Sequence, residues 1–436
     1  MTVTGDPSTT LPTRHPAAAR VLPDSVFYGW YIAIGCAALM FVGVGVGYYG
    51  LAVFLGPLRD AHGWSNAAVS GATGLYFTVS GITGAVVGPR VDRHGPLRIQ
   101  AVGLVLLAGA VALVGLVGTL WQLYAVYTLL AVGFGMSTAV GVNAIMARWF
   151  VHRRARAMSI SFTGVSVGGV VLVPLGTALV SAGGLELASP VLAAMVLAVG
   201  LPVVLGVLVW DPRQMGLAPD GGVPPPAVRR ATLDDAVQLR PWTRREAIRT
   251  GAFWAILVGF VVVLMAQTGF IIHQISFLEE RFDSSTAAAS ALSVTAFGSI
   301  VARLIVGAFA DRIDKRVLTL VLLGVQGTAV LAIVATESTV LTYALVLVVG
   351  FTIGNIYMMQ SLLVSEMFGI VSFGTVFGLI GVASQTGSGL GPLAVGWLED
   401  VSGGYTTPFT VTAIATYAAA VIISFARPPG PEAARD

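Results

Sequence analysis

Residues 88–93 read Gly-Pro-Arg-Val-Asp-Arg, and residues 307–312 read Gly-Ala-Phe-Ala-Asp-Arg. Both stretches have the pattern Gly-x-x-x-Asp-Arg, and each follows a long apolar run. They are 219 residues apart, the difference between positions 307 and 88. Pro174 and Pro392 repeat at nearly the same separation, 218 residues. Matches that recur at one separation predict that the chain consists of two homologous halves.

The composition predicts a protein embedded in a membrane. Of the 436 residues, 56% are hydrophobic and 10% are charged, whereas a soluble domain carries about 25% charged residues. The apolar runs are close to the roughly 20 residues that cross a bilayer as a helix, and they lack the alternation of a membrane β-barrel. We therefore expect an all-α membrane protein with twelve transmembrane helices, at residues 27–55, 66–89, 97–118, 121–147, 157–182, 189–210, 252–278, 285–310, 316–335, 339–363, 373–398 and 406–426.

The expected spans divide the chain into two pseudo-symmetric six-helix bundles, residues 27–210 and 251–426. A cytosolic linker at residues 211–250, rich in Pro, Arg and Asp, joins them and is expected to be flexible. Residues 1–26 contain several prolines but no apolar core, so they predict a disordered cytosolic tail and no signal peptide. Residues 427–436 are expected to form a second cytosolic tail.

The distribution of positive charge predicts the orientation in the membrane. Most of the 24 Lys and Arg residues fall in the termini, the linker and the loops after spans 2, 4 and 8. The opposite loops contain only Arg59 and Arg281. By the positive-inside rule, both termini and the linker are cytoplasmic. Lys315 is the only lysine, and heavy use of Ala, Gly and Val suggests a GC-rich bacterial genome, so we expect a bacterial plasma membrane.

Several motifs resemble those of the major facilitator superfamily, and the resemblance covers essentially the whole chain. Stretch 88–93 is similar to that family's signature loop, and stretch 307–312 fits its duplication. The resemblance implies a secondary transporter whose substrate lies between two halves near the membrane midplane. Within the superfamily, the chain is similar to the monocarboxylate transporter and oxalate:formate antiporter group at Tyr28-Gly29-Trp30, Gly63-Trp64-Ser65, Arg148-Trp149-Phe150, Asp211-Pro212 and Pro219-Asp220-Gly221.

The two repeated stretches also suggest a conformational latch. Asp92 and Asp311 lie where a span ends at the cytosol, so each carboxylate could pair with arginines and with the positive N-terminus of a neighbouring helix. Such contacts would hold the cytoplasmic side closed and break when the protein opens inward. The alternative is simple anchoring of helices by positive charge. The expected latch residues are Gly88, Asp92, Arg93, Gly307, Asp311 and Arg312.

Arg303 is the leading substrate-binding candidate. It lies within span 8, eight residues before Asp311, hence about 12 Å from the cytosolic end. An arginine at this depth is costly and marks a functional site facing a cavity, and its planar fork suits a carboxylate. The alternative is a structural arginine capped by carbonyls of adjacent helices. In the related transporters, an arginine in this span meets the substrate carboxylate, and Arg303 matches it.

The companions of this arginine differ from those of the related transporters. Animal monocarboxylate transporters have an aspartate one turn earlier, where this chain has Ser299, and a lysine in span 1, where it has Tyr48-Tyr49-Gly50. Oxalate exchangers have a lysine in span 11, which is absent here. A single cation favours a monoanion. The other residues expected to bind substrate are Tyr49, Tyr76, Asn143, Asn355, Tyr357 and Gln385, because polar side chains within spans line either a cavity or a helix contact.

His273, near the outer end of span 7, is the proton-coupling candidate, because histidine titrates near neutral pH; the alternative is a hydrogen-bonding residue at the interface. No ATP-binding loop, metal cluster or catalytic constellation occurs, so we expect no enzyme activity, no cofactor and no metal. We expect a monomer that contacts lipid and does not bind nucleic acid. The preferred function is uniport or proton symport of a small monocarboxylate such as lactate or pyruvate by alternating access. Alternatives are export of a drug or hydrophobic metabolite and a non-transporting membrane sensor.

Overall fold

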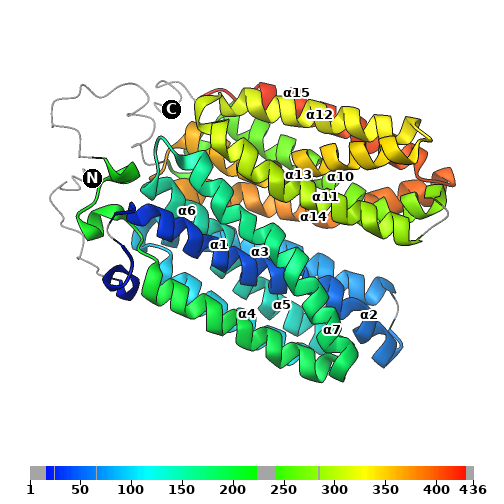
Figure 1. The fold of residues 1–436 in the computed structure, drawn as a ribbon, viewed down its shortest axis with the longest axis horizontal. Coiled ribbons are helices and arrows are strands. Elements are labelled where there is room, and N and C mark those ends of the chain that lie inside the picture. The colour runs from blue at the N-terminus through cyan, green and yellow to red at the C-terminus, as the bar shows by residue number, and fades with distance from the viewer. Residues whose placement is uncertain (1–15, 24, 65, 223–241, 283–284, 429–436) are drawn as a thin grey trace.

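The helices of the protein form two bundles that lie side by side (Figure 1). The computed structural model describes residues 16–23, 25–64, 66–222, 242–282 and 285–428. These residues contain helices and no β-strand. The expected all-α fold is therefore confirmed. Most of the amino-terminal tail, linker residues 223–241 and carboxy-terminal residues 429–436 lie outside the described residues.

The first bundle contains seven α-helices and one short π-helix among the described residues. Its helices are α1 (Tyr28–Gly47), α2 (Gly50–His62), α3 (Asn66–His94), α4 (Leu97–Val114), α5 (Leu120–Ser137), α6 (Ala139–Trp149), α7 (Arg154–Pro202) and the π-helix η2 (Val203–Val207).

The second bundle, as far as it is described, has six α-helices and one 3-10 turn. They are α10 (Gly251–Phe282), α11 (Ser285–Phe309), the turn η5 (Ala310–Arg312), α12 (Lys315–Ala335), α13 (Thr339–Phe368), α14 (Phe373–Ser402) and α15 (Thr406–Ser424).

Local breaks explain why spans and helices differ in number in the first bundle. Span 1 is divided between α1 and α2 at Tyr48 and Tyr49, and span 4 between α5 and α6 at Thr138. Span 5 lies within α7 and span 6 begins in α7 and continues through η2; α7 leaves helical geometry at Gly183 and Gly184. Gly184 has φ +67°, a conformation that glycine adopts without a Cβ clash.

Within the described residues, nine stretches are long and apolar enough to cross a membrane. One of them, Arg154–Val207, contains two of the expected spans. The remaining two spans correspond to α3 and α14, whose many Gly, Ser and Thr residues make them less apolar. Nine stretches, one additional span within Arg154–Val207 and these two helices account for twelve spans.

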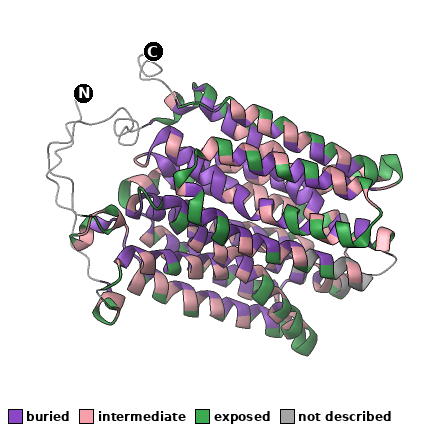
Figure 2. Ribbon diagram, turned by 45° about the horizontal axis from the view of Figure 1, so that its top comes forward, coloured by how far each residue is buried: buried purple, intermediate pink, exposed green. Residues whose placement is uncertain are grey.

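The two bundles meet where α3 packs on α14 and where α7 packs on α11. Figure 2 shows buried residues inside the bundles and between them, with exposed residues along the outer faces. Gly88 allows the first contact, because a Cβ there would lie 2.0 Å from the Gly374 carbonyl oxygen. Gly307 allows the second, since its Cβ would lie 2.2 Å from the Cβ of Ser159. The glycines of the two repeated stretches therefore occupy equivalent close contacts.

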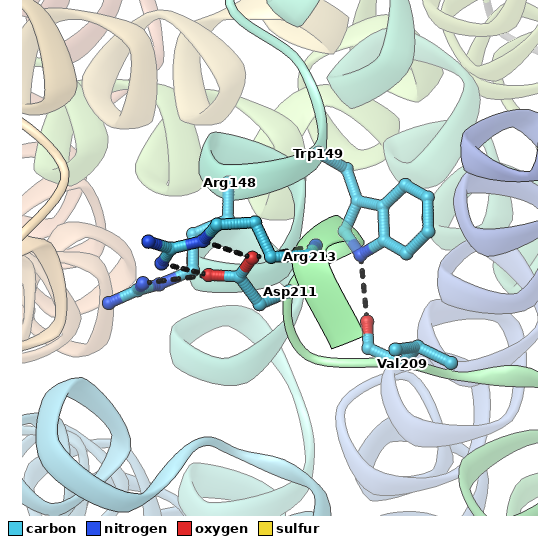
Figure 3. A network of polar contacts seen from close by, with 5 residues as sticks. All are labelled: Arg148, Trp149, Val209, Asp211 and Arg213. Atoms are coloured by element: carbon cyan, nitrogen blue, oxygen red, sulfur yellow. Dashed lines mark hydrogen bonds and ion pairs between the residues drawn. The ribbon is translucent and has the colours of Figure 1, made fainter. Parts of the chain in front are cut away.

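The first part of the linker is packed against the first bundle, unlike the flexible segment that we expected. Asp211 accepts hydrogen bonds from Arg213 Nε at 2.8 Å and Arg148 Nη1 at 3.2 Å, and Trp149 Nε1 donates to the Val209 carbonyl at 2.8 Å (Figure 3). The guanidinium of Arg148 also lies over the Trp210 ring, 4.1 Å from its centroid. The end of the first bundle is thus tied to the start of the linker.

Short elements continue this packing along the linker. They are the 3-10 turns η3 (Pro212–Met215) and η4 (Pro219–Gly221) and the helix α9 (Arg244–Ile248). Asp220 in η4 accepts backbone hydrogen bonds from residues 151–153 just before α7. In the amino-terminal tail, Ala17–Arg20 form the 3-10 helix η1, which corrects the expectation of disorder at these four residues. We call the end of the molecule that carries Asp92, Asp311 and these linker elements the linker end.

Candidate functional site

A cavity of about 200 Å³ lies between the two bundles. Its wall is built by α1, α3, α5, α6 and α7 of the first half and by α10, α11, α13 and α14 of the second half, together with Tyr48 and Tyr49 at the break between α1 and α2. Most of the wall is apolar. The polar part consists of Tyr48, Tyr49, Ser80, Thr138, Ser166, Gln267, Thr268, Ser299, Arg303, Tyr357, Gln360, Ser384 and Gln385.

Arg303 in α11 lies in this wall and is 5% exposed. Its Nε donates to the Gly354 carbonyl in α13, and its Nη1 donates to the Phe162 carbonyl at 2.7 Å and to the Ser166 hydroxyl, both in α7. The hydroxyl of Ser159 in α7 donates to the carbonyl of Arg303 itself. Three of the five guanidinium N–H groups are therefore satisfied by protein oxygens, and two of these acceptors belong to the opposite half.

The remaining nitrogen of Arg303, Nη2, makes no hydrogen bond to any residue that the structure describes. No carboxylate forms an ion pair with Arg303 within the described ranges, and its wall neighbours include no Asp, Glu, His or Lys. Because a buried guanidinium requires acceptors for its N–H groups, Nη2 is available to an anion in the cavity. Both interpretations of Arg303, structural and substrate-binding, therefore apply to part of the side chain. Backbone carbonyls cap part of the guanidinium, and the rest lines the cavity.

Three of the six other predicted substrate-binding residues lie in the cavity wall: Tyr49, Tyr357 and Gln385. Tyr357 Oη lies 3.4 Å from Gln385 Oε1, to which it donates, and 3.2 Å from the Ser388 hydroxyl. Gln385 Nε2 reaches the Ser80 hydroxyl of the first half at 3.5 Å. These side chains form a second polar group in the wall, formed mainly by α13 and α14.

The structure places Tyr76, Asn143 and Asn355 outside the cavity wall. All three are fully buried. Asn355 Nδ2 donates to the Phe351 carbonyl of its own helix, and Tyr76 packs against Phe134 with ring centroids 5.6 Å apart. Tyr76 and Asn355 thus contact residues of their own half, because a polar residue in a span can face a helix contact as readily as a cavity.

His273 in α10 also lies outside the wall of the cavity. Its Nε2 is 3.0 Å from the Pro392 carbonyl oxygen, and its Nδ1 is 3.3 Å from Tyr405 Oη. A carbonyl can only accept, so Nε2 carries a proton, while the tyrosine hydroxyl can either donate or accept. Both contacts therefore remain possible when His273 is neutral and when it is protonated.

The two repeated aspartates bind the N-termini of helices in the opposite half. Asp92 accepts from Gly374 N at 2.8 Å, from Thr375 N at 2.7 Å and from the Thr375 hydroxyl at 2.7 Å. Asp311 accepts from Ala155 N at 2.6 Å and Arg156 N at 3.1 Å. The donor N–H groups belong to the second and third residues of α14 and α7, and they repeat the 219-residue separation.

Both contacts close the linker end, and the positive helix N-terminus favours the carboxylate in each. Arg93 and Arg312 take no part in these hydrogen bonds and are exposed. Of the two expected kinds of partner, arginines and helix N-termini, the carboxylates bind backbone N–H groups at the helix N-termini across the interface.

Sequence reasoning missed the serines that surround Arg303. Ser159 and Ser166 contact Arg303 from α7, and Ser299 lies 3.2 Å from Ser166 between their hydroxyl oxygens. Serine in a transmembrane helix commonly bonds to its own backbone, as Ser161 does with Ala157, so the sequence carried no signal for these contacts.

Two bundles of membrane helices around a central cavity whose wall, in the described residues, has one charged side chain are typical of a membrane transporter. The chain belongs to the Major Facilitator Superfamily, whose pattern it matches over residues 36–392. It is a transporter and not an enzyme. It is 23% identical over 402 residues to the oxalate:formate antiporter of Oxalobacter formigenes, covering 92% of this chain and 91% of that protein. It is 26% identical over 402 residues to monocarboxylate transporter 13 of Bos taurus, covering 90% and 88%.

The fold is similar to that of the Escherichia coli fucose:proton symporter, with a TM-score of 0.67 and 15% sequence identity. The likeness covers 91% of this chain and 98% of the symporter. At this identity it supports the two-bundle architecture, not a shared substrate.

Proposed function

We propose that this chain moves a small monocarboxylate of the lactate or pyruvate type across the membrane by alternating access, with a proton as the coupling ion. The observation that carries the proposal is Arg303. It is the one charged side chain of the cavity wall in the part of the chain that the structure describes, and its Nη2 has no protein acceptor. A guanidinium binds a carboxylate through strong, charge-assisted hydrogen bonds. One positive charge balances a monoanion rather than a dicarboxylate. Two of its relatives support transport of a small carboxylate, being an oxalate:formate antiporter and a monocarboxylate transporter.

The contacts of Arg303 link substrate binding to the movement of the two halves. Phe162 and Ser166, which accept from Nη1, lie in α7, whereas Arg303 lies in α11. When the linker end opens, these helices separate and Nη1 loses both acceptors. A substrate carboxylate would replace them. By the positive-inside rule the linker end faces the cytoplasm, so the conformation described here is the one closed on the cytoplasmic side.

His273 is our proposal for the proton site. It lies on α10, the helix that also contributes Gln267, Thr268 and Ile271 to the cavity wall. Its contacts to Pro392 and Tyr405 tolerate both protonation states. Protonation at the outer end of α10 would add a positive charge that accompanies an anion in the neighbouring cavity.

Uptake of labelled lactate and pyruvate into proteoliposomes tests the proposal, with and without an inward proton gradient. We expect Arg303→Ala to reduce uptake by about 10- to 100-fold, because hydrogen bonds to charged groups contribute about 1.5–3 kcal/mol. We expect His273→Gln to retain binding and lose the response to the gradient. Arg98→Ala, which removes an exposed arginine of α4, is the matched control and should transport normally. Unchanged uptake by Arg303→Ala would contradict the role of the arginine. Uptake that does not respond to the proton gradient would contradict proton coupling and the role of His273 as the proton site.

Export of a drug or hydrophobic metabolite is the second candidate function, because much of the cavity wall is apolar. Met40, Val44, Phe134, Phe162 and Phe377 all contribute to it. Extrusion of a hydrophobic dye from the same proteoliposomes, without transport of lactate or pyruvate, would favour this alternative.

A further inference from the structure

Gln267 in α10 is a buried residue of the cavity wall with an unused hydrogen-bond acceptor. The side chain is 3% exposed, and its Nε2 donates to the Ile353 carbonyl of α13 at 3.2 Å. Its Oε1 contacts no donor in the described part of the chain. Because a carbonyl only accepts, the nitrogen must face Ile353, and this fixes Oε1 as the free atom of the amide.

Gln267 and Arg303 are anchored to consecutive carbonyls of the same helix. Gln267 binds the oxygen of Ile353, and Arg303 Nε binds the oxygen of Gly354. Successive residues of an α-helix are separated by about 1.5 Å along its axis. The amide from α10 and the guanidinium from α11 therefore converge on one turn of α13. Both residues line the same cavity.

Gly354 permits this convergence. A Cβ at this position would lie 2.6 Å from the Ser299 carbonyl oxygen and 2.7 Å from its hydroxyl oxygen. The missing side chain lets α13 approach α11 closely enough for Arg303 to reach the backbone of α13. The positions of Arg303 and Gln267 are thus set by backbone contacts, which makes their relative placement rigid.

We propose that Gln267 Oε1 accepts a hydrogen bond from a hydroxyl group of the substrate whose carboxylate binds Arg303. The inference rests on the proposed transport of a monocarboxylate and deepens it. The preferred substrate is then a short monocarboxylate with a hydroxyl close to its carboxylate, rather than the corresponding oxo acid or unsubstituted acid. A site with a buried acceptor discriminates against analogues that lack the donor, because the acceptor then stays unpaired.

Competition experiments with purified full-length protein in proteoliposomes test the role of Gln267. Labelled lactate is exchanged against internal lactate, and external lactate, pyruvate or propanoate serves as competitor. Lactate carries the hydroxyl, pyruvate has an oxo group that cannot donate, and propanoate has neither. We expect pyruvate and propanoate to compete about five- to tenfold more weakly than lactate. In Gln267→Leu and in the nearly isosteric Gln267→Met, competition by lactate should weaken to the level of propanoate. Competition by propanoate itself should be unchanged.

A matched control is available in α12. Gln326 is also a buried glutamine, 2% exposed, with an unpartnered Oε1, but it lies outside the cavity wall. Gln326→Leu should keep the preference for lactate. The lactate-to-propanoate ratio is measured within each variant, so differences in the amount of folded protein cancel.

Equal competition by lactate and propanoate in the wild type would overturn the role of Gln267, and so would an equal loss for both acids in Gln267→Leu. In either case, uptake that still depends on Arg303 leaves the monocarboxylate function standing. Wild-type protein that transports none of the three acids would overturn both proposals together.

Discussion

Arg303 of the second half donates a hydrogen bond from Nη1 to the hydroxyl of Ser166 in the first half. The same nitrogen donates to the Phe162 carbonyl, so a buried cation of one half depends on acceptors of the other. A buried donor that loses its acceptor costs about 1–3 kcal/mol. An empty carrier should therefore change conformation slowly, and a carrier with a bound carboxylate should change faster.

This coupling predicts that lactate inside the vesicles accelerates the uptake of labelled lactate by about tenfold or more, since about 1.4 kcal/mol corresponds to a factor of ten. Ser166→Ala removes one of the acceptors that the empty carrier must give up. We expect this variant to reduce the acceleration by about fivefold. Ser161→Ala is the control, because among the described residues the hydroxyl of Ser161 bonds only to Ala33 and Ala157 of its own half. Equal uptake with and without internal lactate would contradict the coupling.

The two latch aspartates should differ in strength. Asp92 accepts three hydrogen bonds across the interface and Asp311 accepts two. Asp92→Asn and Asp311→Asn should both shift the protein toward opening at the linker end, with the larger shift for Asp92. Distances between spin labels at Arg98 and Arg312 measure this opening.

Asp314 supplies the control for the latch. Its carboxylate accepts from Val317 N and caps α12 within the second half. Asn at this position keeps an oxygen that can accept from Val317 N, so Asp314→Asn should change neither the stability nor the balance between open and closed states appreciably. A shift as large as that of Asp92→Asn would show that the measurement reports loss of negative charge and not loss of the latch.

The sequence was sufficient to predict the architecture and the position of the charged side chain of Arg303 within a span. Apolar runs and the 219-residue repeat report the duplication directly, since each span must be apolar and each half reuses the same loop. Arg303 was identifiable because a charge inside a span is rare and costly. The repeated aspartates were identifiable for a similar reason, as acids among arginines at helix ends.

The sequence could not show which side of a helix a neutral polar residue faces. Asn143 and Gln267 look alike as isolated polar residues in apolar runs, yet only Gln267 lies in the cavity wall. The distinction depends on the rotation of each helix and on its neighbours, which glycines such as Gly354 determine through close contacts. The docking of linker residues 211–222 was missed for a related reason, because it depends on the partners Arg148 and His152 more than 60 residues away.

Gly88 should be intolerant of even one additional methyl group. A Cβ there would lie 2.0 Å from the Gly374 carbonyl oxygen, and both partners are backbone, so neither can rotate away. Gly88→Ala should separate α3 from α14, weaken the adjacent Asp92 contacts and reduce transport by at least about tenfold. Gly109→Ala in α4 is the matched control, because nothing lies within 4 Å of a Cβ at that position. Normal transport by Gly88→Ala would mean that the interface is looser than the structure shows.

Asp211 should make the stability of the protein sensitive to acid. Burial raises the pKa of the Asp211 carboxyl, but the hydrogen bonds from Arg213 and the charges of Arg213 and Arg148 outweigh burial and hold the pKa below its ordinary value. Because the pKa is lower in the folded state, the ionised carboxylate stabilises the protein above the unfolded value, near 4. This stabilisation is lost as the pH falls through the lower, folded pKa.

Thermal unfolding in detergent at pH 7 and pH 3 measures this contribution. We expect Asp211→Asn to lower the Tm by about 2–4 °C at pH 7 and by less at pH 3, where the wild-type carboxylate begins to be neutralised. Asp400→Asn, which changes an exposed aspartate at the far end of α14, should alter the Tm little at either pH. An equal decrease at both pH values would attribute the effect of Asp211→Asn to altered packing of the linker. A decrease confined to neutral pH would show that the charge of Asp211 joins the linker to the first bundle through Arg148 and Arg213.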